Sequence, residues 1–274
     1  MKTLVLHSLE TSAAKKLALE LRGEIEVRKS HFRIHTKKDF DIENFRFSNN
    51  FDLNIFDNNF DYQNIKLMVS DMDSTLITVE TIDEVAKEVG LKDEISLITE
   101  AAMQGHLDFT ESFKKRLSIL KGVSNSSFES VYNKKVEFSP GAKVLIEYFK
   151  SNQIRTAVVS GGLSFFAKKL QSQLGIDNCR ANNVEIINQS ITGNVIGNVI
   201  DAKEKAKYID ELCDQYKLKN NQVIAIGDGA NDIEMMKVAG LSVAYHAKPI
   251  LKQYCDIQIN YGSLASLIDF FEYA

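Results

Sequence analysis

The stretch IKLMVSDMDSTL, residues 65–76, is an apolar run that ends in two aspartates and a polar loop. Residues two apart along a strand face the same way, so Asp71 and Asp73 would be presented together where the strand ends. One carboxylate could then attack a phosphoryl group while the other handles the proton. A lone D-x-D pattern also arises from ion-pair spacing or turn chemistry, so the rest of the chain must decide between these interpretations.

Short, apolar, β-branched segments alternate with helical patterns after residue 65. Such segments predict an α/β fold with a doubly wound, mostly parallel (Rossmann-like) sheet that helices cover on both faces. In that fold ligands bind beyond the carboxyl ends of the strands. The expected strands are 65–71, 155–161, 222–228, 241–247 and 256–259, the expected helices are 140–152, 163–174, 203–217 and 231–239, and 184–200 is expected to form a hairpin.

Two further parts are expected beside this core, which should comprise residues 63–79 and 138–274. A helical-bundle cap is predicted at 80–137, inserted directly after the acidic loop, with helices over 81–89, 93–104, 109–120 and 127–135. Residues 1–62 predict a small N-terminal α+β unit: a strand at 3–7, a helix at 12–22 that Gly23 closes, a strand at 24–35 and a short strand within 51–56. A passive helical insertion is the alternative to a cap.

The composition and net charge of the chain are those of an ordinary globular protein. The chain has 274 residues, 44% of them hydrophobic and 26% charged, which is ordinary for a soluble globular protein. Its formal net charge of −4 gives no reason to expect nucleic acid or an anionic membrane as a partner. The sequence has no apolar stretch of 18 residues and its initial apolar run is too short for the apolar core of a signal peptide, so a cytoplasmic protein is expected. The three cysteines are widely spaced, which predicts free thiols in a reducing compartment. The oligomeric state does not follow from the sequence, and a homodimer is left open.

The second expected strand finishes with a serine, in the segment VVSGG at 158–162. The hydroxyl of Ser160 and the amides near the next helix, including that of Gly161, can hold phosphate oxygens. The nucleophile of an α/β-hydrolase needs a glycine two residues before the serine, where this chain has Val158, so Ser160 is expected to bind and not to attack. A serine that only caps a helix is the alternative.

The third expected strand finishes with an acid and runs into a turn, in the segment IGDGAND at 226–232. Its glycines let the chain turn close to an ion, and oxygen ligands of this kind suit Mg²⁺. Asn231 and Asp232 would orient these ligands and Lys205, which by itself would be an ordinary surface lysine. A carboxylate that attacks a phosphate meets like charge, about 4 kcal/mol per pair at ~4 Å and an effective dielectric near 20, so a cation is needed there.

With DMDST, VVSGG, Lys205 and GDGAND in this order, the chain resembles the haloacid dehalogenase-like phosphatases over residues 65–260, and above all those that act on phosphoserine. The resemblance implies Mg²⁺-dependent hydrolysis of O-phospho-L-serine through an aspartyl phosphate, the last step of serine biosynthesis. It implies that Asp71 is the nucleophile and Asp73 the general acid and base. The implied phosphate-binding residues are Ser160, Gly161, Lys205 and Asn231, and the implied Mg²⁺ ligands are Asp71, the carbonyl of Asp73 and Asp228.

The resemblance also assigns substrate recognition in the cap to Glu80, Met103, Phe109 and Arg116. The spacing agrees, because Phe109 and Arg116 are seven residues apart and so lie two turns along one helix face. An acid and a guanidinium suit the ammonium and the carboxylate of an α-amino acid. The alternative is that Arg116 is merely exposed and that the two apolar residues belong to an ordinary core.

Two rival functions remain at this point. A related enzyme could act on another small phosphate monoester or transfer the phosphate to a second alcohol. A phospho-accepting receiver domain also uses an aspartate at a strand end in a doubly wound sheet. The receiver is disfavoured because Asp73 could hydrolyse the acyl phosphate and because a receiver needs no large cap.

Overall fold

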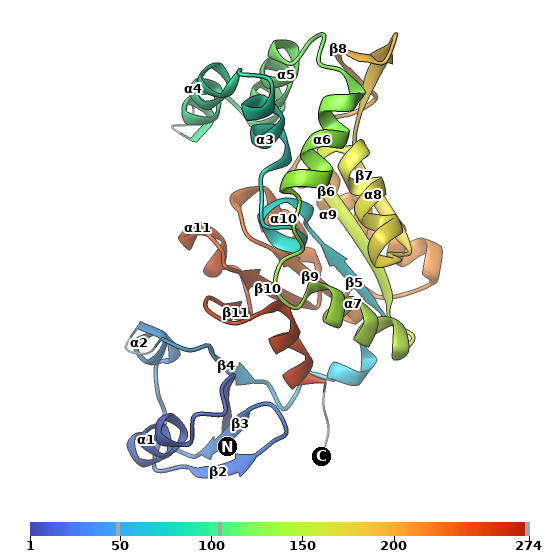
Figure 1. Cartoon of the computed structure of the whole chain (residues 1–274). Helices are drawn as coiled ribbons and strands as arrows, with labels where there is room; N and C mark the ends of the chain where they lie inside the picture. Colours follow the sequence, from blue (N-terminus) through green and yellow to red (C-terminus); the bar gives the residue numbers. More distant parts are fainter. Residues whose placement is uncertain (48–49, 104–105, 272–274) are drawn as a thin grey trace.

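The computed structural model describes residues 1–47, 50–103 and 106–271, apart from the side chains of Phe47 and Met103. A small N-terminal unit, a central sheet flanked by helices and a helical cap follow one another through the molecule (Figure 1). No helix among the described residues is both long and apolar enough to cross a membrane.

The central sheet has the strand order β11-β10-β9-β5-β6-β7-β8, and its strand pairs are parallel except for the antiparallel pair β7–β8. The predicted α/β fold is therefore confirmed. Its strands are β5 (Leu67–Ser70), β6 (Arg155–Leu163), β7 (Asn178–Ile187), β8 (Ser190–Ile196), β9 (Val223–Gly227), β10 (Leu241–Tyr245) and β11 (Ile257–Ile259).

Helices cover both faces of this sheet, so its strands are apolar on both sides. Leu67 and Val69 pack on one face with α9 and α10, while Met68 packs on the other face with α7 and α8. The helices of the core are α7 (Ala142–Ser151), α8 (Ser164–Leu174), α9 (Ala202–Tyr216), α10 (Ile233–Val238) and α11 (Pro249–Lys252).

The cap consists of α3 (Thr81–Glu88), α4 (Lys92–Met103), α5 (Phe109–Ile119) and α6 (Asn125–Lys135). The two chain segments that lead into and out of it lie side by side, because Ile77 and Phe138 form an antiparallel bridge. The cap also touches the β7–β8 hairpin, where the amide of Gly122 donates to the carbonyl of Ile191 at 2.8 Å. Cap helix α6 also contacts core helix α8, where Nζ of Lys169 lies 2.7 Å from Oε2 of Glu129.

The N-terminal unit is a four-stranded antiparallel sheet, order β2-β3-β1-β4, with helix α1 packed on it. The side chain of Asn54 pairs with both backbone groups of Gln258 in edge strand β11, at 3.0 and 2.8 Å. The unit therefore covers one edge of the central sheet. Its elements are β1 (Lys2–Leu6), α1 (Thr11–Leu21), β2 (Glu24–Val27), β3 (Phe32–Thr36), α2 (Ile42–Phe47) and β4 (Leu53–Phe56).

Three expected segments differ from the structure. The single strand expected at 24–35 is wrong: β2 and β3 are separate strands, and between them the amide of Arg28 donates to the carbonyl of His31. The hairpin expected at 184–200 is present as the antiparallel pair β7–β8 between Asn183 and Ile196, but strand β7 starts earlier, at Asn178, and first pairs in parallel with β6. Strand β6 continues to Leu163, two residues beyond its expected end, so both glycines after Ser160 lie within the strand and α8 begins at Ser164.

Candidate active site

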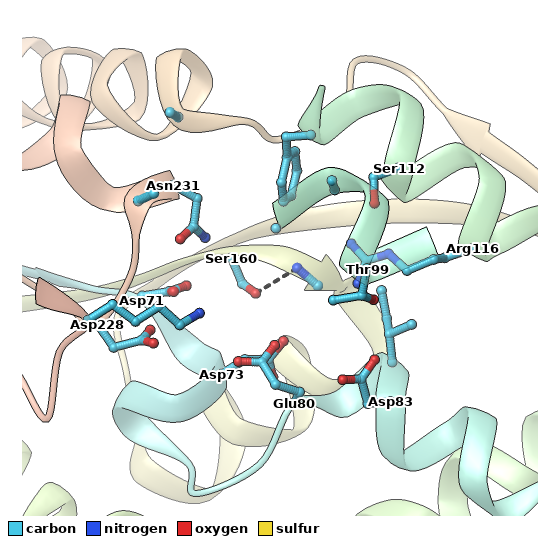
Figure 2. Close-up of a pocket in the computed structure, with 18 of the residues that line it drawn as sticks. Asp71, Asp73, Glu80, Asp83, Thr99, Ser112, Arg116, Ser160, Asp228 and Asn231 are labelled. Carbon is cyan, nitrogen blue, oxygen red and sulfur yellow. Dashed lines mark hydrogen bonds between the residues drawn. The ribbon is translucent and has the colours of Figure 1, made fainter. Parts of the chain in front are cut away.

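Asp71 directly follows β5, and hydrogen bonds fix its carboxylate. The side chain is buried, the amide of Met72 donates to its Oδ1 at 2.8 Å, and Nζ of Lys205 lies 2.8 Å from the same oxygen. The chain then turns sharply through Met72–Leu76, where Ser74 adopts a left-handed conformation with φ of 55°. This turn brings Asp73 to the same side of the sheet edge as Asp71, as Figure 2 shows.

Lys205 reaches Asp71 from α9 and is fully buried. Its Nζ lies 2.7 Å from Oδ1 of Asp232, whose other oxygen accepts the amides of Asp228 and Gly229, each at 3.1 Å. Residue 227 has to be a glycine, because a methyl group there would overlap the Asp232 carboxylate. Asp232 therefore holds the 227–229 turn and Lys205 in one arrangement.

The carboxylates of Asp71, Asp228 and Asp232 have oxygens within 4.8 Å of one another, and Lys205 is the cation that contacts two of them. Burial, followed by the charge of Asp232, raises the pKa of Asp71 well above its ordinary range and that of Asp228 to about 7. Three acids against one ammonium leave an excess of negative charge. A divalent cation would remove this excess, and a donor set of oxygens alone fits Mg²⁺.

Asp73 and Glu80 each accept a hydrogen bond that joins the acidic loop to the start of the first cap helix. Oγ1 of Thr81 donates to Oδ2 of Asp73 at 3.2 Å, and Oγ of Ser74 donates to Oε1 of Glu80 at 2.7 Å. Burial, followed by the charges of Glu80 and Asp71, raises the pKa of Asp73 well above its ordinary range. A carboxyl group with a raised pKa is suited to act as a general acid.

Ser160 and the two glycines after it, at the end of β6, form another wall of the space around Asp71 and Asp73. The buried Oγ of Ser160 accepts the amide of Gly162 at 2.8 Å, drawn as a dashed line in Figure 2. A methyl group at position 162 would fall 2.7 Å from Oδ2 of Asp73, and one at position 161 would fall 2.5 Å from the ring of Phe109. The glycines therefore let the backbone approach Asp73 and let Phe109 lie over the strand.

Arg116 comes from cap helix α5 and lies across the cavity from Asp71 and Asp228 (Figure 2). Its Nε is buried and has no hydrogen-bond partner among the described residues. Burial lowers the pKa of the guanidinium, while the charges of Asp83, Glu80 and Asp73 act in the opposite direction. A charged donor without a partner at a cavity wall is suited to binding an anionic group of a ligand.

These groups surround one cavity of about 770 Å³, a volume typical of small-molecule sites. Lys205 does not line it and contacts Asp71 from the core side, and the side chain of Met103 lies outside the described residues. The other sequence-predicted residues that line the cavity are Asp71, Asp73, Glu80, Phe109, Arg116, Ser160, Gly161, Asp228 and Asn231.

The structure adds cavity residues that sequence reasoning missed, namely Asp83, Thr99, Ser112, Lys248 and Ile250. Helical spacing could have indicated three of them. Asp83 follows Glu80 by three residues at the start of a helix, Ser112 lies three after Phe109 and four before Arg116, and Thr99 lies four before Met103, so each falls at helical spacing from a predicted residue. Lys248 and Ile250 come from a segment in which no predicted residue stands at such a spacing.

Comparisons with known proteins identify the family of this chain. A family model described as haloacid dehalogenase-like hydrolase matches residues 68–237. A phosphoserine phosphatase from Polaromonas sp. is 43% identical over 209 residues, which cover 74% of this chain and 89% of the relative.

Solved structures agree as well. An HAD family hydrolase from Salmonella enterica superposes with a TM-score of 0.91 at 27% identity and covers 99% of both chains, so its fold includes a counterpart of the N-terminal unit. A phospho-aspartyl intermediate analogue of phosphoserine phosphatase has a TM-score of 0.70 at 37% identity and covers 75% of this chain and 98% of its own. The chain therefore belongs to the haloacid dehalogenase-like hydrolase family and is one of its phosphatases.

Proposed function

We propose that this phosphatase hydrolyses O-phospho-L-serine to serine and phosphate through an aspartyl phosphate on Asp71, the reaction that ends serine biosynthesis. The observation that carries the choice of substrate is the cap wall of the cavity. There Arg116 presents a buried, unpartnered Nε, and Glu80 offers a carboxylate near Asp73. These two charges complement the carboxylate and the ammonium of an amino acid. The relatives named phosphoserine phosphatase support the same substrate.

In the first half of the reaction, an oxygen of Asp71 attacks phosphorus and the ester bond to the serine oxygen breaks. Asp73 gives its proton to the leaving hydroxyl, for which its raised pKa prepares it. In the second half, Asp73 takes a proton from a water molecule that attacks the phosphorus of the acyl phosphate. The bond between phosphorus and the Asp71 oxygen breaks, and phosphate is released. Ser160 and the amide of Gly161 hold the phosphate oxygens, and Asn231 supports them from the 227–232 turn. Lys205 holds Asp71 from the core side and offsets the negative charge there.

The carboxylates of Asp71 and Asp228 and the backbone carbonyl of Asp73 would hold Mg²⁺ on this proposal. Asp232 is already engaged by Lys205 and two amides, so its role is to orient. When bound, Mg²⁺ neutralises charge on the phosphate and keeps Asp71 ionised. Phe109, which lies over Gly161, helps to exclude water from the acyl phosphate until serine has left.

The test compares two substrates in cap variants. Arg116→Ala and Glu80→Ala should each lower kcat/KM for phosphoserine by about 30-fold to several thousand-fold, since losing one partner of a desolvated charge contact costs ~2–5 kcal/mol. Hydrolysis of p-nitrophenyl phosphate, which has neither group, should fall far less. Lys115→Ala is the matched control, because Lys115 is exposed on the same helix and does not line the cavity.

Equal losses on both substrates would contradict the assignment of Glu80 and Arg116 to the amino acid. The same variants would then point to another small phosphate monoester, and phosphate release over a panel of phosphorylated amino acids and sugars would identify it.

A further inference from the structure

Asn182 lies on β7 behind the cavity, fully buried, and its side chain makes two hydrogen bonds. Its Nδ2 donates to the carbonyl of Gly161 at 2.8 Å, and its Oδ1 accepts the amide of Ile200 at 2.8 Å. The orientation of the side-chain amide is fixed by its partners, because a carbonyl only accepts and a backbone amide only donates. Asn182 thus connects the segment that carries Ser160 to the segment that leads into α9.

The first connection falls where the β6–β7 ladder is interrupted. Val159 pairs with Arg180 and Leu163 with Asn182, so three residues of β6 stand opposite one residue of β7. Such a bulge leaves backbone groups unpaired and aims side chains out of the ladder. The carbonyl of Gly161 is one of these backbone groups, and the side chain of Asn182 supplies its partner.

Holding that carbonyl also fixes the amide that follows it. The C=O of Gly161 and the N–H of Gly162 belong to one planar trans peptide and point in opposite directions. With the carbonyl held by Asn182, the N–H of Gly162 points to Oγ of Ser160 at 2.8 Å. Because Oγ accepts this bond, the hydroxyl proton of Ser160 is left to donate to a ligand.

The second connection fixes the start of the helix that carries Lys205. Ile200, whose amide Asn182 accepts, directly precedes Asp201, and the Asp201 carboxylate caps α9 by accepting the amide of Glu204 at 2.9 Å. Lys205 lies in the first turns of this helix and contacts Asp71. The buried side chain of Asn182 therefore sets the distance between β6, which carries Ser160, and α9, which carries Lys205.

We propose that Asn182 is a positioning residue for phosphate binding: by bridging Gly161 and Ile200 it sets the Ser160 hydroxyl and Lys205 at the separation that a phosphoryl group requires. The inference rests on the proposed function only in taking phosphate as the group bound. It makes no use of the amino-acid part of the substrate.

The test uses Asn182→Asp, which keeps an acceptor for Ile200 and loses the donor to Gly161. The inhibition constant for inorganic phosphate should rise about 10- to 100-fold, the range expected when one hydrogen bond that orients a charged contact is lost. The kcat/KM for phosphoserine and for p-nitrophenyl phosphate should fall by similar factors, since both share the phosphoryl group. Asn183→Asp is the matched control, because it adds the same charge one residue away at an exposed position and should leave all three values unchanged.

Two readouts separate positioning from a general structural role. The rise in unfolding temperature that Mg²⁺ causes should be the same in Asn182→Asp as in the unmodified protein, because Asp71 and Asp228 do not depend on the Gly161 carbonyl. In a Ser160→Ala background, Asn182→Asp should weaken phosphate binding by only a few-fold, since its effect passes through Ser160.

Unchanged phosphate inhibition in folded Asn182→Asp, an equal loss in Asn183→Asp, or an equal loss of Mg²⁺ binding would each overturn the proposal. If Asn182→Asp does not fold, the uncharged Asn182→Ser is held to the same criterion. Failure of the proposed function would show differently, as a lack of preference for phosphoserine in the unmodified protein, and the phosphate measurements would still decide the role of Asn182.

Discussion

The catalytic core has two interfaces, one with the N-terminal unit and one with the cap. The two interfaces differ in how many hydrogen-bond donors their buried carboxylates receive. At the N-terminal interface, Asp52 accepts the backbone amides of Asn260, Tyr261 and Gly262 at 2.6, 3.2 and 2.7 Å. Asp269 accepts Oγ of Ser30 at 2.5 Å and lies 2.7 Å from Nδ1 of His7. Both acids are supplied with donors by the protein itself.

The electrostatic outcome follows from these donors. Burial alone would raise the pKa of Asp269, but hydrogen bonds from His31, His7 and Ser30 outweigh it and hold the pKa well below its ordinary range. At the cap interface the donors are too few, and the pKa values of Asp71, Asp73 and Asp228 are all raised. The two carboxylates of the first interface have their donors within the folded protein, whereas those of the second are complementary to charges that a metal ion and a substrate bring.

The largest difference should appear when one carboxylate of each interface is replaced. Asp71→Asn should lower kcat by on the order of 10⁴-fold or more, because the attacking oxygen is lost. Asp269→Asn should leave kcat per folded molecule unchanged, although it weakens the N-terminal interface. Turnover and thermal unfolding of both purified variants check this, and a folded Asp71→Asn enzyme with near-normal turnover would refute the mechanism.

The N-terminal interface should matter for stability. Asp52→Ala removes the acceptor of three backbone amides, and a buried donor left unpaired costs about 1–3 kcal/mol, so the free energy of unfolding should fall by roughly 3 kcal/mol or more. Urea unfolding of the purified variant measures this loss in the free energy of unfolding. Asp39→Ala, which removes an exposed carboxylate of the same unit, is the control and should leave the urea midpoint unchanged. Equal midpoints for the two variants would show that the unit is not held by Asp52.

The cap interface should gain stability from its cation. Mg²⁺ at 100 times its Kd should raise the free energy of unfolding by about 2.7 kcal/mol, because only the folded chain assembles Asp71 and Asp228. Thermal unfolding with and without a chelator measures the gain. Asp228→Asn should abolish it, and Asp269→Asn should retain it. A gain of the same size in Asp228→Asn would place the ion elsewhere.

The contrast between the interfaces also explains what the sequence could predict. Asp71, Ser160 and Asp228 were predicted together because short apolar runs mark buried strands and parallel strands end at one sheet edge. The start of β7 was missed because Asn178–Asn183 is a polar stretch that is held in the sheet by backbone pairing with β6. The turn at 28–31 was missed because it contains neither glycine nor proline.

Contacts between residues far apart in sequence were beyond prediction. The bonds from Asn182 to Gly161 and from Asp52 to Gly262 join segments that only the folded topology brings together. The left-handed conformation of Ser74 is similar, because the crowded turn after Asp71 imposes it on a residue without intrinsic preference for it. The strand ends and the orienting residue Asp232, which lies in the same motif as Asp228, could therefore be predicted, whereas Asn182 and Asp52 could not.

The smallest expected effect is a pH dependence of stability at the N-terminal interface. The pKa of Asp269 is lower in the folded protein than the ~3.9 of an unfolded aspartate, so between these two values the unfolded chain binds more protons. The stabilisation from Asp269 is therefore fully present above about pH 4 and is lost as the pH falls toward the folded pKa, by at most about 1.4 kcal/mol per pH unit for one proton. His7, His31 and Arg33 face this carboxylate or its backbone, so the comparison has to isolate Asp269 itself. Urea unfolding between pH 3 and 5 gives the free energy of unfolding as a function of pH, and the slope of this plot should be shallower in Asp269→Asn than in the unmodified protein. Asp39→Ala is the control, because it leaves the Asp269 contacts intact, and its slope should stay closer to that of the unmodified protein. A slope that is the same in all three proteins would mean that the hydrogen bonds of Asp269 persist in the unfolded state or contribute nothing to its titration, and the contrast between the two interfaces would then be one of geometry alone.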